Sequence, residues 1–178
     1  QPARVEFILV DDGSRDKTWE LIQELTRQYP PQSGQSVIVR GLKQHNLGKG
    51  GAVKRGMMYT RGRSVLFLDA DGATHYTEIG PILKTVTEEA NRHPSGLACV
   101  CGSRNLGGEV QRKGIRKMLN TVQNALVRMV LGQGVRDTQC GFKIFSREAA
   151  KRIFPTQHLE RWAFDIELLY LCREKAVP

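Results

Sequence analysis

The chain has 178 residues, which is enough for one mid-sized domain and too few for two independent cores. Hydrophobic residues make up 40% and charged residues 25% of it, which excludes a disordered, collagen-like or coiled-coil protein. Lysine and arginine number 27 against 18 aspartate and glutamate residues, giving a net charge of +9. This excess predicts polyanionic partners, which are nucleic acid, acidic lipid headgroups or phosphorylated small molecules.

The cysteines and the apolar runs indicate the setting in which the domain works. The four cysteines form no CxxC pair, so we expect reduced thiols in a cytosol-facing domain. The given sequence contains no run of about 18 apolar residues, and no signal-peptide pattern is visible at Gln1. Because strand-like sequence starts close to Gln1, we expect a segment of a longer protein, with any membrane segment outside it.

Strands and helices are predicted to alternate in the first hundred residues. Apolar runs at 5–10, 37–39, 65–68 and 98–101 are too short for stable helices and end at polar or glycine-rich turns, so they are predicted strands. This alternation predicts an α/β domain with a largely parallel sheet covered by helices on both faces. The intervening helices are expected over 19–29, 52–59 and 79–90.

A long basic helix is expected in the second half. Apolar residues between 115 and 129 form one stripe of this helix, and four cations crowd its first turns. Two interpretations of these cations are about equally supported: they bind an anion, or they form a solvated face of the helix. Later elements are a strand at 142–145, a helix at 146–153 capped by Ser146, and a last helix at 163–174.

Polar side chains follow the predicted strands where each strand ends. Ligands of such sheets bind beyond the carboxyl ends of the strands, so these side chains should share one rim. They are Asp11, Asp12, Asp69, Asp71, Ser103 and Arg104.

Asp69 and Asp71 are two residues apart at the end of an apolar strand, which turns both carboxylates toward the same side. Two such groups suit Mg²⁺ or Mn²⁺, which keep open positions for diphosphate oxygens. The tripeptide alone is also typical of a solvated turn, and its place on the shared rim favours the metal.

Two further turns on this rim offer contacts for a nucleotide. Asp11 and Asp12 can accept hydrogen bonds from a base or from ribose hydroxyls, although an Asx turn with Ser14 is also expected. The glycine-rich turn at 46–51 offers backbone N–H groups and Lys49 to phosphate oxygens. Its spacing is not that of a P-loop.

Five motifs occur in the order found in family 2 glycosyltransferases of the GT-A fold, and the chain resembles that family from about residue 5 to 171. They are Val10-Asp11-Asp12-Gly13-Ser14, Asn46-Leu47-Gly48-Lys49-Gly50-Gly51-Ala52, Asp69-Ala70-Asp71-Gly72, Cys101-Gly102-Ser103-Arg104 and Arg136-Asp137-Thr138-Gln139-Cys140-Gly141-Phe142-Lys143. The last motif and the stretch at 161–169 are similar to the branch that glucosylates dolichyl phosphate. The resemblance implies one GT-A-like domain over 1–178 that lacks the family's first strand and its membrane segment.

The resemblance implies inverting transfer of glucose from UDP-glucose to dolichyl phosphate, for protein N-glycosylation at the cytosolic face of the endoplasmic reticulum membrane. Donor-binding residues would be Asp11, Asp12, Lys49, Asp69 and Asp71, and the last two would hold the metal. The acceptor phosphate would be bound by Arg104, Arg116 and Asn120, and the catalytic set would be Asp71, Arg104 and Arg116.

Less specific residues complete the prediction. Asp137, Gln139 and Asp165 are expected to contact sugar hydroxyls or to orient basic groups, whereas Trp162 and Phe164 are expected in the core. Three alternatives stay open: a polyprenyl-phosphate sugar transferase that uses another donor such as GDP-mannose, an inactive GT-A segment, and a basic nucleic-acid-binding module. The last is disfavoured because aromatic residues make up only 7% of the chain.

Overall fold

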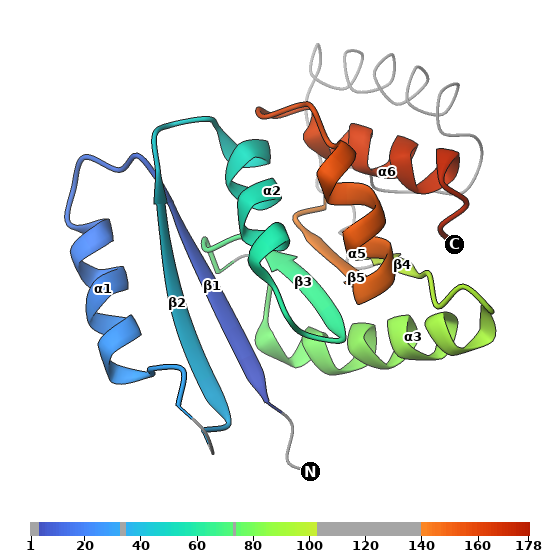
Figure 1. Cartoon of the computed structure of the whole chain (residues 1–178), viewed down its shortest axis with the longest axis horizontal. Coiled ribbons are helices and arrows are strands. Elements are labelled where there is room, and N and C mark those ends of the chain that lie inside the picture. Colours follow the sequence, from blue (N-terminus) through green and yellow to red (C-terminus); the bar gives the residue numbers. More distant parts are fainter. Residues whose placement is uncertain (1–3, 33–34, 73, 103–139) are drawn as a thin grey trace, which may run out of the picture.

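The computed structural model describes residues 4–32, 35–72, 74–102 and 140–178 (Figure 1). It confirms the predicted α/β class, because strands and helices alternate through the first hundred residues. The elements are β1 (Val5–Asp12), α1 (Thr18–Gln28), β2 (Val37–Gln44), α2 (Lys49–Tyr59), β3 (Ser64–Leu68), η1 (Tyr76–Glu78), α3 (Ile79–Arg92), β4 (Cys99–Cys101), β5 (Phe142–Ser146), α5 (Arg147–Ile153), η3 (Phe154–Thr156) and α6 (Phe164–Glu174).

The described strands form two sheets. β1 and β2 pair in parallel along their whole length, with Asp11 opposite Lys43 and Asp12 opposite Gln44. The second sheet has the order β3-β5-β4, and β5 runs antiparallel to both of its neighbours. Figure 1 shows β1 and β3 pointing the same way. The carboxyl ends of β1, β2 and β3 therefore face one edge of the molecule, where the predicted site residues begin.

Helices cover both faces of the second sheet. On one face, α2, α5 and α6 enclose a core that includes the buried rings of Phe145, Phe154 and Phe164. On the other face, α3 packs its Val86 against a cluster that includes Ile144. All five residues of β5 are buried, so this strand lies at the centre of the sheet and of the packing.

Helix α2 connects the two sheets. A β-carbon at Gly56 would lie 3.2 Å from Cγ2 of Val10, so the helix lies close against β1 at this point. The next residue, Met57, is buried in the same core cluster as Val65 and Phe67 of β3. Helix α2 thus fixes the carboxyl ends of β1 and β3 relative to each other.

Two helix starts bear on the sequence prediction. Helix α2 begins at Lys49, earlier than the expected start at 52, so the second half of the glycine-rich turn is helical. Ser146 caps α5 as predicted, since its hydroxyl accepts a hydrogen bond from the N–H of Ala149 at 3.3 Å. The helix expected over 115–129 lies outside the described residues. Among the helices that are described, none is long and apolar enough to cross a membrane.

Candidate functional site

Asp12, at the end of β1, holds the glycine-rich turn. Its Oδ1 accepts hydrogen bonds from Nε2 of Gln44 at 2.7 Å and from the N–H of Leu47 at 2.9 Å. Its Oδ2 accepts from the N–H of Gly48 at 2.8 Å, and Gly48 has a φ of 91°, which favours glycine. These three contacts fix the backbone that leads directly into Lys49.

The sequence predicted that backbone N–H groups of this turn bind phosphate. For three of them this prediction is wrong, because they donate to acceptors within the protein. Those of Leu47 and Gly48 are taken by Asp12, and that of Gly51 donates to the carbonyl of Glu160 at 2.9 Å. A carboxylate of the protein itself therefore occupies the position at which the sequence suggested an external anion. The part of the turn that faces other charged groups is the side chain of Lys49.

Asp11 is the most deeply buried carboxylate of the rim. Its exposed fraction is 1%, and its Oδ1 accepts a hydrogen bond from the N–H of Ser14 at 2.9 Å, three residues on rather than the two of an Asx turn. Its Oδ2 is buried and has no hydrogen-bond partner among the residues that the structure describes. A buried oxygen of this kind is costly unless a donor reaches it, so it marks a place where a ligand donor would fit.

Asp69 and Lys49 meet across the rim. The Nζ atom of Lys49 lies 2.8 Å from the Asp69 carboxylate, and each side chain is 32% exposed. The same carboxylate lies against the loop before β5, where a β-carbon at Gly141 would lie 2.2 Å from Asp69 Oδ2. The loop before β5 therefore lies so close to Asp69 that only glycine fits at position 141.

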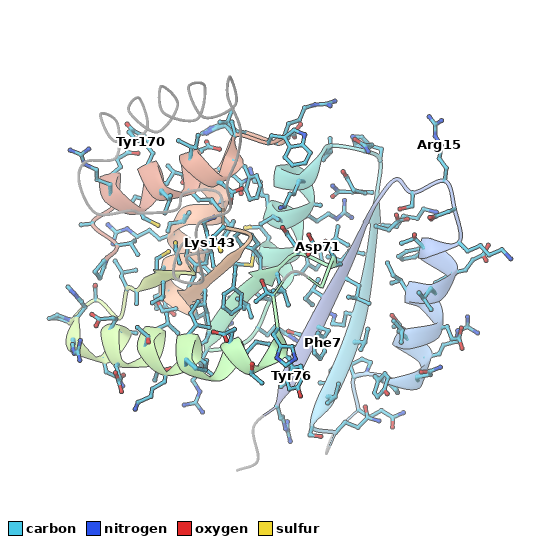
Figure 2. All side chains as sticks on the ribbon, turned by 180° about the vertical axis from the view of Figure 1, so that it is seen from behind. Phe7, Arg15, Asp71, Tyr76, Lys143 and Tyr170 are labelled. Carbon is cyan, nitrogen blue, oxygen red and sulfur yellow. The ribbon has the colours of Figure 1, made fainter. Side chains whose placement is uncertain are left out.

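Asp71 lies two residues further along, in an exposed turn with Gly72 at a φ of 72°. Figure 2 shows Asp71 on the loop that follows β3, well away from Arg15 at the far end of the molecule. The described residues contain no group of three or more histidine, cysteine or acidic side chains that could hold a metal ion. The donor set of Asp69 and Asp71 still fits Mg²⁺ or Mn²⁺, since such ions are commonly held by one or two carboxylates together with phosphate oxygens and water.

Behind Asp69 lies a buried ion pair that the sequence reading missed. The Nζ atom of Lys143, in β5, lies 2.6 Å from Oδ1 of Asp165 and 2.6 Å from the carbonyl of Cys140, and it lies over the ring of Phe67. Lys143 is fully buried, and burial raises the pKa of Asp165 while the Lys143 ammonium opposes this rise. The signal in the sequence was a lysine inside an otherwise apolar strand.

The segment between α5 and α6 packs onto the start of α2. Nε2 of Gln157 donates to the carbonyl of Gly50 at 2.9 Å, and Glu167 accepts from the N–H groups of His158 and Leu159 at 2.8 and 2.7 Å. This segment therefore borders the rim from the side of α6.

The two aromatic residues of this region behave differently. Phe164 is fully buried, as predicted. The prediction that Trp162 belongs to the core is wrong, because its exposed fraction is 84%.

The structure thus brings together Asp11, Asp12, Lys49 and Asp69 on one rim, with Asp71 in the adjoining turn and Asp165 behind it. It does not test the remaining predicted residues. Those outside the described residues are Ser103, Arg104, Arg116, Asn120, Asp137 and Gln139.

Several known proteins are similar to the chain. It is 39% identical over 175 residues to a dolichyl-phosphate beta-glucosyltransferase of Dictyostelium discoideum, and this match covers 97% of the chain and 52% of the relative. It is 40% identical over 176 residues to the protein of that name from Homo sapiens, covering 97% of the chain and 53% of the relative. It is 33% identical over 183 residues to the protein of that name from Saccharomyces cerevisiae, covering 98% of the chain and 54% of the relative. The chain spans about half the length of these relatives.

A family model provides the broader assignment. The model described as glycosyl transferase family 2 matches residues 1–154, which include the rim, the glycine-rich turn and the loop before β5. The α/β fold and the acidic residues at the strand ends agree with this match. The chain therefore belongs to glycosyl transferase family 2.

Proposed function

We propose that this chain is the donor-binding region of an enzyme that transfers glucose from UDP-glucose to dolichyl phosphate, with inversion at the anomeric carbon. One observation carries the proposal: the match to dolichyl-phosphate beta-glucosyltransferases, at 33–40% identity, extends over at least 97% of the chain. The product would be dolichyl β-D-glucosyl phosphate, a sugar donor for protein N-glycosylation.

The buried carboxylate of Asp11 supports a nucleoside contact. Its unpartnered Oδ2 can accept a hydrogen bond from a uracil N–H or from a ribose hydroxyl, which would remove the cost of leaving a buried acceptor unpaired. Asp12 has its partners inside the protein, so we assign it the support of the turn that carries Lys49.

Asp69 and Asp71 would hold a divalent cation. When bound, this ion stabilises the negative charge that grows on the departing UDP. Lys49 adds a positive charge on the same rim, close enough to reach a phosphate group held there. The absence of a side chain at Gly141 leaves room for the Asp69 carboxylate in this position.

The acceptor phosphate is already anionic at neutral pH, so no residue has to remove a proton from it. One of its oxygens forms the new bond to the anomeric carbon, the bond from that carbon to UDP breaks, and UDP leaves with the electron pair. What the reaction needs is positive charge that relieves the approach of two anions. We assign this task to Arg104 and Arg116, with Asn120 beside them.

Dolichyl phosphate is a membrane lipid, so the enzyme would work at a membrane surface, and we propose the cytosolic face of the endoplasmic reticulum. The net charge of +9 would favour contact with anionic lipid.

The direct test is a donor panel. The full chain is incubated with a short polyprenyl phosphate, Mn²⁺ and either UDP-glucose or GDP-mannose carrying a labelled sugar, and lipid-linked label is measured. We expect glucose transfer and little mannose transfer. Preferential mannose transfer would show the alternative donor, whereas absence of transfer and of UDP binding, with salt-sensitive DNA binding, would show a nucleic-acid-binding module.

Two variants test the roles of the residues. Asp71→Ala should abolish transfer while the protein stays folded, because Asp71 lies in an exposed turn. Arg104→Ala should raise KM for the acceptor more than KM for UDP-glucose. Unchanged turnover in the first variant, or an unchanged acceptor KM in the second, would refute the assigned role.

A further inference from the structure

Lys49 forms an ion pair with Asp69, whose carboxylate we also propose as a metal ligand. The Nζ atom of Lys49 is 2.8 Å from the carboxylate, and both side chains are only one-third exposed. A divalent cation that binds Asp69 meets an ammonium group already at hydrogen-bond distance. Because Nζ lies 2.8 Å from both Oδ1 and Oδ2 of Asp69, a metal on either oxygen lies close to the ammonium, and the repulsion between the two like charges favours displacement of one of them.

Lys49 is the partner that can move. The backbone before it is fixed, because Asp12 accepts hydrogen bonds from the N–H groups of Leu47 and Gly48. Asp69 has the shorter side chain, and the loop before β5 limits its movement on one side, where a β-carbon at Gly141 would lie 2.2 Å from Oδ2. The adjustable part of the pair is therefore the flexible four-carbon side chain of Lys49.

A displaced Lys49 ammonium needs another anion. Lys49 is the first residue of the eleven-residue helix α2, where the helix dipole disfavours a positive charge. The nearby Asp165 feels the charge of Lys49, but it already has Lys143 at 2.6 Å as its own partner. A diphosphate bound next to the metal is an anion that the free ammonium can reach.

We propose that Lys49 couples the binding of the divalent cation to the binding of the nucleotide diphosphate: it occupies Asp69 in the absence of donor and pairs with the diphosphate once the cation has taken Asp69. This inference rests on the proposed function. It predicts opposite effects on two ligands when Lys49 is removed. The cation alone gains affinity because its competitor is gone, and the nucleotide loses affinity because a phosphate partner is gone.

The test is calorimetric titration of the full chain with Mn²⁺ alone, with UDP alone and with each in the presence of the other. In Lys49→Met, Mn²⁺ alone should bind about two- to fivefold more tightly, as expected when a partly exposed ion pair no longer competes. UDP in the presence of Mn²⁺ should bind about tenfold more weakly. The control is Lys84→Met, which removes the same charge from an exposed position on α3 and should change neither affinity.

A second variant should change Mn²⁺ affinity in the opposite direction, and it provides a test even if the first variant does not fold. Lys49→Arg keeps the charge and can pair with Asp69 through two nitrogens, so Mn²⁺ alone should bind more weakly than in the wild type. If the wild type binds Mn²⁺ and UDP but neither variant moves Mn²⁺ affinity in these directions, the coupling role of Lys49 is refuted while the proposed function stands. If the wild type binds neither ligand, both are refuted.

Discussion

The α-carbon of Gly141 faces the carboxylate of Asp69 so closely that a β-carbon would lie 2.2 Å from Oδ2 and 2.6 Å from Cγ. The contact joins the loop before β5 to the end of β3, two segments more than seventy residues apart in the sequence. It makes the absence of a side chain at position 141 a requirement for the position of Asp69.

Gly141→Ala should therefore act on the site through crowding. We expect a loss of about 1–3 kcal/mol in the free energy of unfolding, typical of overpacking. Transfer should fall at least tenfold, because Asp69 is pushed from its position. Gly80→Ala is the matched control, since no atom lies within 4 Å of its added β-carbon. Denaturant unfolding and initial rates measure the two effects, and full activity of Gly141→Ala would contradict the contact.

Asp12→Ala removes the acceptor for Nε2 of Gln44 and for the N–H groups of Leu47 and Gly48 in the glycine-rich turn. Two of these donors are backbone N–H groups that would lose their partner, so we expect a loss of about 1–3 kcal/mol in the free energy of unfolding. Because Lys49 follows directly, the affinity for UDP should fall as well. Asp12→Asn keeps one acceptor oxygen and should lie between the wild type and Asp12→Ala in a urea titration. Equal stability of all three proteins would refute this role.

Phe164 and Trp162 are two residues apart and should respond oppositely to truncation. Phe164 is fully buried, so Phe164→Ala should cost about 3–5 kcal/mol. Trp162 is 84% exposed, so Trp162→Ala should stay within about 0.5 kcal/mol of the wild type. Denaturant unfolding compares the two, and similar losses would show that Trp162 is packed after all.

Removing one partner of the Lys143–Asp165 pair should lower the free energy of unfolding much more than replacing both partners by apolar residues. Lys143→Met leaves a buried carboxylate without its counter-ion, for which we expect a loss of about 3–5 kcal/mol. The double variant Lys143→Met with Asp165→Leu should recover most of this loss. A urea double-mutant cycle measures the coupling, and strictly additive losses would mean that the two groups do not interact.

The raised pKa of Asp165 predicts a pH dependence of stability. A carboxyl group whose pKa is higher in the folded protein takes up its proton there first, so its contribution is complete below the unfolded pKa of about 4 and is lost as pH rises through the folded pKa. The free energy of unfolding of the wild type minus that of Asp165→Asn should therefore decrease from pH 4 to pH 7. An increase over this range would mean that Lys143 outweighs burial and lowers the pKa.

The strands of the first half could be located because each contains an apolar run, although β1 and β2 continue beyond the predicted runs at 5–10 and 37–39 to Asp12 and Gln44. The run at 65–68 ends at Asp69, and the structure ends β3 at Leu68. The direction of β5 could not be predicted from the sequence, since an isolated run such as 142–145 carries no information about its neighbours in the sheet. The same limit hid the partner of Lys143, which lies on a different element at Asp165.

The sequence predicted which side chains lie together on the rim, but it did not predict the contacts that they make with one another. Asp69 and Asp71 stood out because of their spacing, whereas the pairing of Asp69 with Lys49 depends on how α2 joins the two sheets. The exposure of Trp162 likewise depends on the hydrogen bonds that hold the neighbouring backbone to α2 and to Glu167. Aromatic character alone predicts burial, and these tethers override it.

The division of the described strands into two sheets affects how the chain behaves in solution. Among the described residues, β1 has a strand partner on one edge only, and its Val5 and Phe7 are about half exposed. An apolar strand with an open edge is a template for intermolecular β-pairing. Substitution of Phe7 by lysine, which places a charge on this edge, should therefore reduce aggregation of the chain as measured by light scattering.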